Sequence, residues 1–314
     1  MNSFTAYIKS NYRTDKSLKS LWNIVVGART QQTYFDAAMQ QLLPVYELSP
    51  SYPLHKFEEK IKALDDNCSL KLYPYFYLAS EVSFQALRLL IQTSSELSYH
   101  NNKFMPVSSD IMIQRQVKRI VHAINPDQLH YVRDDLTMLV DAVHQKFGHN
   151  IFIYQLSGNN TRAINDTQLA RNLNMELVEL KFKLFVEKNF IINLLRNAPF
   201  KVFNQLYYRV PLHKNTLKTY RLIHNNDIEA TSKLLKLRTH TIQDHIIEMI
   251  IKDYEVDIMR YIDTKELEMI FNHYKTAQYG KLKTFYVNSQ VDDYFKLKLG
   301  ITKASISERS IYEY

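Results

Sequence analysis

Hydrophobic positions along this chain recur mostly with the three- and four-residue spacing of an α-helix. Leu18, Leu21, Trp22 and Val25 follow the i, i+3, i+4, i+7 pattern, which places four side chains on one helical face. Comparable patterns predict further helices at residues 30–41, 53–64, 109–124, 126–147 and 176–195, and a long apolar stretch covers residues 74–97. Strand signals are few, and residues 283–287 give the best one. The pattern therefore predicts a mainly α, multi-domain protein.

Helix-starting residues and polar breaks divide the chain further. Side chains typical of helix starts precede several of these segments: Asp15 or Ser17, Thr30, Pro126 with Asp127, and Thr167. Gly148 is a natural helix end. A polar break at 100–103 and the segment between Pro199 and Pro211 suggest two boundaries. We therefore expect an N-terminal helical domain at 1–100, a middle helical domain at 101–210 and a C-terminal domain at 211–314.

Residues 216–253 have the pattern of a helix-turn-helix. A first helix ends near Asn225, Asp227 can cap a second helix at 228–235, and Leu237 and Arg238 form a short turn. Thr239 or Thr241 can cap a third helix that runs to residue 252. Two helices joined by so short a turn are typical of modules that insert the second helix into the DNA major groove. The C-terminal domain is thus expected to be a helix-turn-helix module, with or without a wing.

Polar residues around the turn are the candidate DNA contacts. Arg and Gln side chains there can pair with guanine and adenine edges, and lysines can contact phosphates. The candidate DNA-binding residues are Lys233, Lys236, Arg238, Thr239, His240, Gln243 and Asp244. The same spacing also occurs in helices that merely pack together, so the pattern leaves both interpretations open.

The charge distribution also favours a nucleic-acid-binding surface in the C-terminal half of the chain. The formal net charge is +8, and residues 181–252 hold 13 Lys/Arg against five Asp/Glu, which accounts for the whole surplus. Clustered positive charge is expected of a nucleic-acid surface, although an ordinary solvated surface fits as well. Aromatic clusters at 73–77 and 200–208 are either core residues, which their spacing favours, or stacking platforms for single strands.

Composition argues against catalysis, metals and membranes. The five glycines are scattered, which excludes a glycine-rich phosphate loop, and the single Cys68 excludes an internal disulfide and a thiolate zinc site. The pairs His144/His149 and His240/His245 are five apart, so their side chains do not share a helical face. No apolar run is long enough to cross a bilayer, and no signal peptide is evident. We expect a cytoplasmic protein without enzymatic activity, cofactor, metal or small-molecule substrate.

Residues 227–246, and above all the string Thr-Ile-Gln-Asp-His at 241–245, resemble the helix-turn-helix domain at the C-terminus of RecQ-type helicases. The whole chain, including 26–33 and 155–158, resembles the YpbB-like proteins of low-GC Gram-positive bacteria, which are usually encoded beside a RecQ helicase. Thr231 and Ser232 depart from the usual apolar residue and alanine. Lys236 stands where glycine is common, and lysine tolerates a left-handed backbone poorly.

The resemblance implies a DNA-binding accessory factor that acts with a RecQ-type helicase in DNA repair. Two alternatives remain open at this level. One is a protein–protein adaptor that docks on the helicase without contacting DNA, and the other is a helix-turn-helix transcription regulator.

Overall fold

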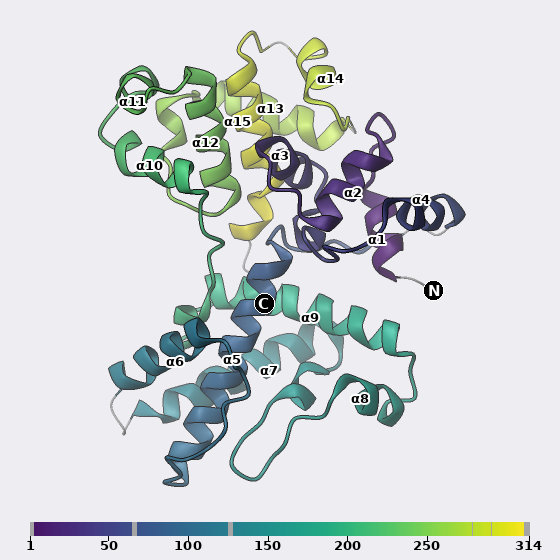
Figure 1. Cartoon of the computed structure of the whole chain (residues 1–314), viewed down its shortest axis with the longest axis vertical. Coiled ribbons are helices and arrows are strands. Elements are labelled where there is room, and N and C mark those ends of the chain that lie inside the picture. Colours follow the sequence, from purple (N-terminus) through teal and green to yellow (C-terminus); the bar gives the residue numbers. More distant parts are fainter. Residues whose placement is uncertain (1–2, 65–67, 125–127, 278, 290, 311–314) are drawn as a thin grey trace. The chain divides into compact units, whose positions relative to one another are not determined.

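The computed structural model describes residues 3–64, 68–124, 128–277, 279–289 and 291–310. Its regular elements are α-helices and short 3-10 turns (Figure 1). The α-helices are α1 (Ser3–Asn11), α2 (Leu18–Val26), α3 (Gln31–Met39), α4 (Leu54–Ala63), α5 (Tyr77–Ser98), α6 (Ile111–Ala123), α7 (His130–Phe147), α8 (Asp166–Asn172), α9 (Leu177–Asn197), α10 (Lys214–Ile223), α11 (Ile228–Leu235), α12 (Thr239–Ile251), α13 (Thr264–Thr276), α14 (Leu282–Val287) and α15 (Tyr294–Ser305). The expected all-helical character is confirmed.

Several helix ends form at the residues that the sequence indicates. The Ser17 side chain accepts the backbone N–H of Ser20 at the start of α2, and Thr30 caps α3 in the same way. Gly148 ends α7 in the left-handed conformation. The expected cap Thr167 is wrong, because the side chain of Asn165 caps α8 instead. The suggested helix start at Pro126 and Asp127 lies outside the described residues.

The strand expected at residues 283–287 is wrong, because these residues form the short helix α14. Phe285 is 1% exposed and packs edge-on against the rings of His273 and Tyr279. Strand propensity is weak beside such tertiary packing, so β-favouring residues enter a helix here. Within the described ranges there is one isolated β-bridge, between Gly158 and Thr161, and no strand. The described residues after α12 therefore form the helices α13 to α15 and no β-stranded wing.

The first compact unit consists mainly of Leu70–Tyr208. Its long helices α5 and α9 pack together and are joined by α6, α7 and the 3-10 turn Phe203–Leu206 around one hydrophobic core. Phe203 and Tyr75 are almost fully buried in this unit. These aromatic residues are therefore core rather than exposed stacking platforms.

The second compact unit combines two segments that are far apart in the sequence, Thr5–Ser69 and Arg209–Arg309. Helix α12 lies at its centre and contacts α10, α11, α15 and the N-terminal helix α3. This division differs from three consecutive domains at 1–100, 101–210 and 211–314, because α3 packs against α12 and α15. Contacts between residues more than 200 positions apart cannot be read from composition breaks.

Candidate nucleic-acid interface

Helices α10, α11 and α12 pack against one another as a three-helix module. Asp227 Oδ1 accepts the backbone N–H of Ala230 at 2.7 Å and begins α11. The Arg238 backbone occupies the cap position of α12, with no side-chain cap, so the expected caps Thr239 and Thr241 are wrong. The expected second and third helices are otherwise found at their predicted places.

The turn between α11 and α12 depends on a left-handed residue. Lys236 has φ 54° and ψ 42°, and its N–H reaches the carbonyls of Lys233 and Ser232. The Ser232 hydroxyl donates to the carbonyl oxygen of Leu237 at 2.5 Å, and the Leu237 N–H donates back to Ser232 at 3.0 Å. The unusual Ser232 therefore helps to close the turn, and the module keeps its geometry without a glycine.

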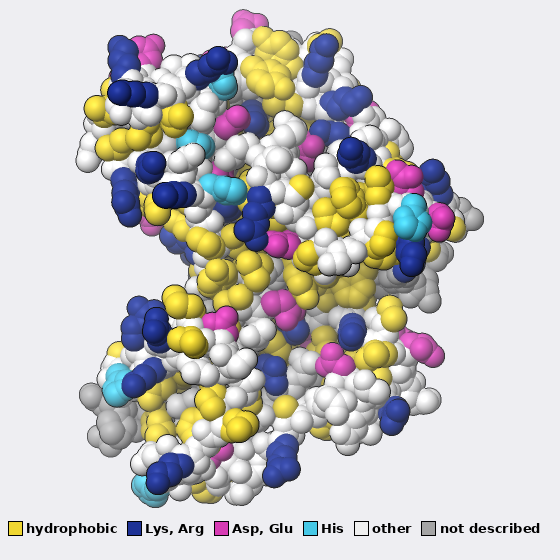
Figure 2. Space-filling model, in the orientation of Figure 1, with side chains coloured by type: hydrophobic (Ala, Val, Ile, Leu, Met, Phe, Trp, Pro, Cys, Tyr) yellow, Lys and Arg dark blue, Asp and Glu magenta, His cyan; other side chains and the backbone are white. Residues whose placement is uncertain are grey.

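The candidate contact residues divide into two groups. Lys233, Lys236, Arg238, Thr239 and His240 are exposed, and no ion pair of the described residues involves these three cations. Several Lys and Arg side chains are visible over α10 and α11 in Figure 2.

The other two candidates are partly covered. Gln243 is half-buried. Asp244 is also half-buried, and its Oδ1 accepts a hydrogen bond from Lys298 Nζ at 2.7 Å. Asp244 is thus engaged within the protein, and the exposed part of α12 is its first turn.

The remainder of α12 is buried around the carboxylate of Glu248, which is 0% exposed. Four donors reach it: Lys252 Nζ at 2.6 Å, Thr216 Oγ1 at 2.5 Å, the His213 N–H at 2.9 Å and Gln31 Nε2 at 2.6 Å. Burial alone raises the pKa of Glu248, but Lys252 and these hydrogen bonds outweigh it and hold the pKa below its usual value. The cluster ties α12 to α10 and to α3.

A second polar contact fixes the same interface. His245 Nδ1 and Thr219 Oγ1 lie 2.7 Å apart between α12 and α10. Burial lowers the pKa of His245, which favours its neutral form. This face of α12 is therefore closed to a ligand.

The basic stretch 181–252 does not form one body. The boundary between the two compact units falls after Tyr208, so its cations belong to both. Lys252 is 3% exposed and pairs with Glu248, so it adds nothing to a basic surface. The exposed Lys and Arg side chains of the helix-turn-helix module therefore lie on α10, on α11 and in the turn before α12.

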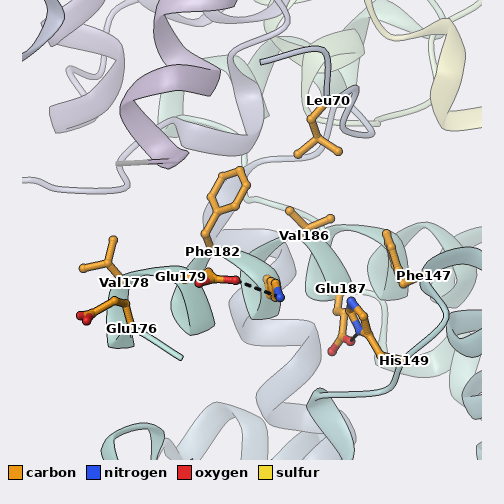
Figure 3. Close-up of a pocket in the computed structure, with 10 residues that line it drawn as sticks. Leu70, Phe147, His149, Glu176, Val178, Glu179, Phe182, Val186 and Glu187 are labelled. Carbon is orange, nitrogen blue, oxygen red and sulfur yellow. Dashed lines mark hydrogen bonds and ion pairs between the residues drawn. The ribbon is translucent and has the colours of Figure 1, made fainter. Parts of the chain in front are cut away.

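A separate hollow of about 860 Å³ lies along α9 in the first unit (Figure 3). Its walls include Phe147, Phe182 and Val186, and Glu179 pairs with Lys183 at 3.0 Å on its rim. His149 Nδ1 lies 2.8 Å from Glu187, whose other donors are the N–H groups of Ile151 and Phe152. These hydrogen bonds lower the pKa of Glu187, but burial outweighs them and raises it above its usual value. No local sequence pattern indicates this pair beyond the position of His149.

Metal and membrane features are absent from the part of the chain that the structure describes. No group of three His, Cys, Asp or Glu side chains there is arranged to hold a metal ion. Likewise, none of its helices combines the length and the apolar character that a bilayer crossing requires.

Comparison with known proteins supports the module. The chain is similar to Protein YpbB of Bacillus subtilis (strain 168), with 23% identity over 239 residues that cover 73% of this chain and 67% of the relative. No solved structure matches. Neither this relative nor the matching family is named for a RecQ-type helicase, so that part of the resemblance stays an expectation. Residues 213–301 match a family described as a helix-turn-helix domain, which suggests DNA binding.

Proposed function

We propose that this protein is a non-enzymatic DNA-binding accessory factor that contacts DNA through the helix-turn-helix module. The observation that carries the proposal is the set of exposed, unpaired cations Lys233, Lys236 and Arg238 at the turn that leads into α12. Such a turn is where a recognition helix approaches the groove and its flanking phosphates. We call these three residues the turn cations.

The first turn of α12 enters the major groove in this proposal. Thr239 and His240 are exposed there, and the half-buried Gln243 lies one turn further along. These side chains contact base edges, while the turn cations neutralise phosphates. Three phosphate contacts correspond to a slope of log affinity against log salt of about −2.7, or a loss of roughly 40-fold between 50 and 200 mM salt.

The test is a fluorescence titration of a short labelled DNA duplex at several salt concentrations. The triple variant K233Q/K236Q/R238Q is expected to weaken binding and to flatten the salt dependence. The matched control R115Q/K118Q/R119Q removes three exposed cations from α6 and should behave as the unmodified protein. Equal affinities and slopes for the two variants would overturn the assignment of the turn cations.

We further propose that the partner is a RecQ-type DNA helicase in DNA repair. The support is the sequence resemblance, together with an apolar surface outside the module: Met105, Ile111 and Met112 are 88%, 62% and 69% exposed. Contiguous patches of exposed apolar side chains are typical of protein-binding surfaces. This surface also suits the adaptor alternative, in which the chain docks on the helicase without contacting DNA.

Co-purification with the helicase, with and without nuclease treatment, separates these two roles. A complex that survives nuclease and is lost in I111S/M112S supports docking through this surface. A complex that disappears with the DNA contradicts it. Protection of one discrete promoter site would instead favour a transcription regulator.

A further inference from the structure

Helix α10 carries a second row of cations that the sequence interpretation did not single out. Lys214, Lys218 and Arg221 are exposed and follow one another at spacings of four and three residues, so they lie on one face of the helix. We call them the α10 stripe. Seven residues of α-helix rise by about 10.5 Å, which is the axial length of roughly three nucleotide steps of one DNA strand at about 3.4 Å each.

The direction of the stripe is set by the opposite face of α10. Thr216 and Thr219 are 0% exposed there and bond to Glu248 and His245 of α12. These two hydrogen bonds fix the rotation of α10 about its axis. The stripe therefore points away from α12 and forms a surface distinct from the first turn of that helix.

The charge of the stripe is not balanced inside the protein. Helix α10 has no Asp or Glu, and none of the three cations forms an ion pair with another described residue. Lys214 and Lys218 repel each other at a spacing of four residues, and Lys214 also opposes the helix dipole at the N-terminus. A polyanion bound along this face would relieve both unfavourable interactions.

We propose that the α10 stripe binds the phosphate backbone of a second DNA duplex segment while the first turn of α12 holds the first segment. This inference rests on the proposed DNA binding of the module. A protein with two such surfaces joins two duplexes, or two arms of one branched DNA. The exposed side chain of Leu217 lies beside these cations, and the charges of the stripe suit contacts with phosphates rather than with base edges.

The test is a capture assay with the full chain at about 50 mM salt, where phosphate contacts are strong. A duplex fixed to beads is loaded with protein, washed and offered a second, fluorescent duplex. The variants are K214Q/K218Q/R221Q for the stripe, K233Q/K236Q/R238Q for the turn cations and R115Q/K118Q/R119Q as the control of equal charge.

The unmodified protein and the control are expected to capture the second duplex. The stripe variant should keep its affinity for a single duplex within about threefold and lose capture by about tenfold or more, because only the second set of phosphate contacts is gone. Its thermal midpoint should not fall, since the substitutions remove a repulsion; this measurement excludes unfolding as the reason for lost capture.

Three results would overturn the proposal. The stripe variant captures as well as the unmodified protein, or it loses single-duplex affinity as strongly as the turn variant, or the unmodified protein binds one duplex and captures no second one. If the unmodified protein binds no duplex at all, the proposed function itself fails, which is a distinguishable outcome.

Discussion

Replacing Lys236 with glycine should stabilise the second unit and at the same time weaken its binding to DNA. Lys236 is exposed and has φ 54°, in the left-handed region that costs an ordinary residue about 1–2 kcal/mol. Glycine avoids this cost, but it raises the conformational entropy of the unfolded chain, which lowers the stability by about 0.4–1 kcal/mol. The net gain is about 0.5–1 kcal/mol, or roughly 1–4 °C in thermal midpoint.

The assay compares Lys236→Gly with Lys236→Ala by urea unfolding and thermal melting. Alanine removes the charge and keeps the left-handed cost, so the glycine variant should be the more stable of the two by about 1 kcal/mol. Both variants lose one phosphate contact, and each should lower the salt slope of DNA binding by about 0.9. A glycine variant no more stable than the alanine variant would refute the argument that strain is stored at this turn.

Three further predictions concern the interior and caps of the module. Asp227→Ala should cost about 1 kcal/mol of unfolding free energy, because the N–H of Ala230 loses its acceptor; Asp227→Ser should restore most of it in urea titrations. Glu248→Gln should cost about 3–5 kcal/mol, because it leaves the buried ammonium of Lys252 without its countercharge; a loss below 1 kcal/mol in the same titrations would contradict this. Since burial lowers the folded-state pKa of His245, the unfolded state binds more protons, and the urea midpoint should fall as the pH drops below about 6.5; in His245→Gln this part of the slope should vanish, and equal slopes would count against it.

Local signals predicted the module well because capping and periodicity act within a few residues. Asp227 begins α11 as expected, and the cations Lys233, Lys236 and Arg238 are exposed. The cost of a left-handed lysine was also visible in the sequence, since the position is one where glycine is common.

Long-range contacts account for what the sequence did not predict. Asp244 pairs with a lysine 54 positions away, and Gln31 reaches Glu248 across 217 positions. Neither contact has a local pattern, so the sequence could not show that α12 is covered by an N-terminal helix. In α14, packing of Phe285 against His273 and Tyr279 decides the conformation, and it outweighs the β propensity of the local sequence.

The packing of α3 against α12 has a consequence for how the chain is made. Helices α1 to α4 leave the ribosome well before α12 and α15, because residues 70–208 are synthesised in between. At about 5–20 residues per second, the synthesis of residues 70–208 alone takes roughly 7–28 s. During this time, Tyr34 and Phe35 lack part of their packing, because in the finished fold they are 4% and 1% exposed and contact His213 and Lys298 respectively. We therefore expect the segment of α1 to α4 to expose apolar side chains to chaperones until α12 and α15 have been synthesised.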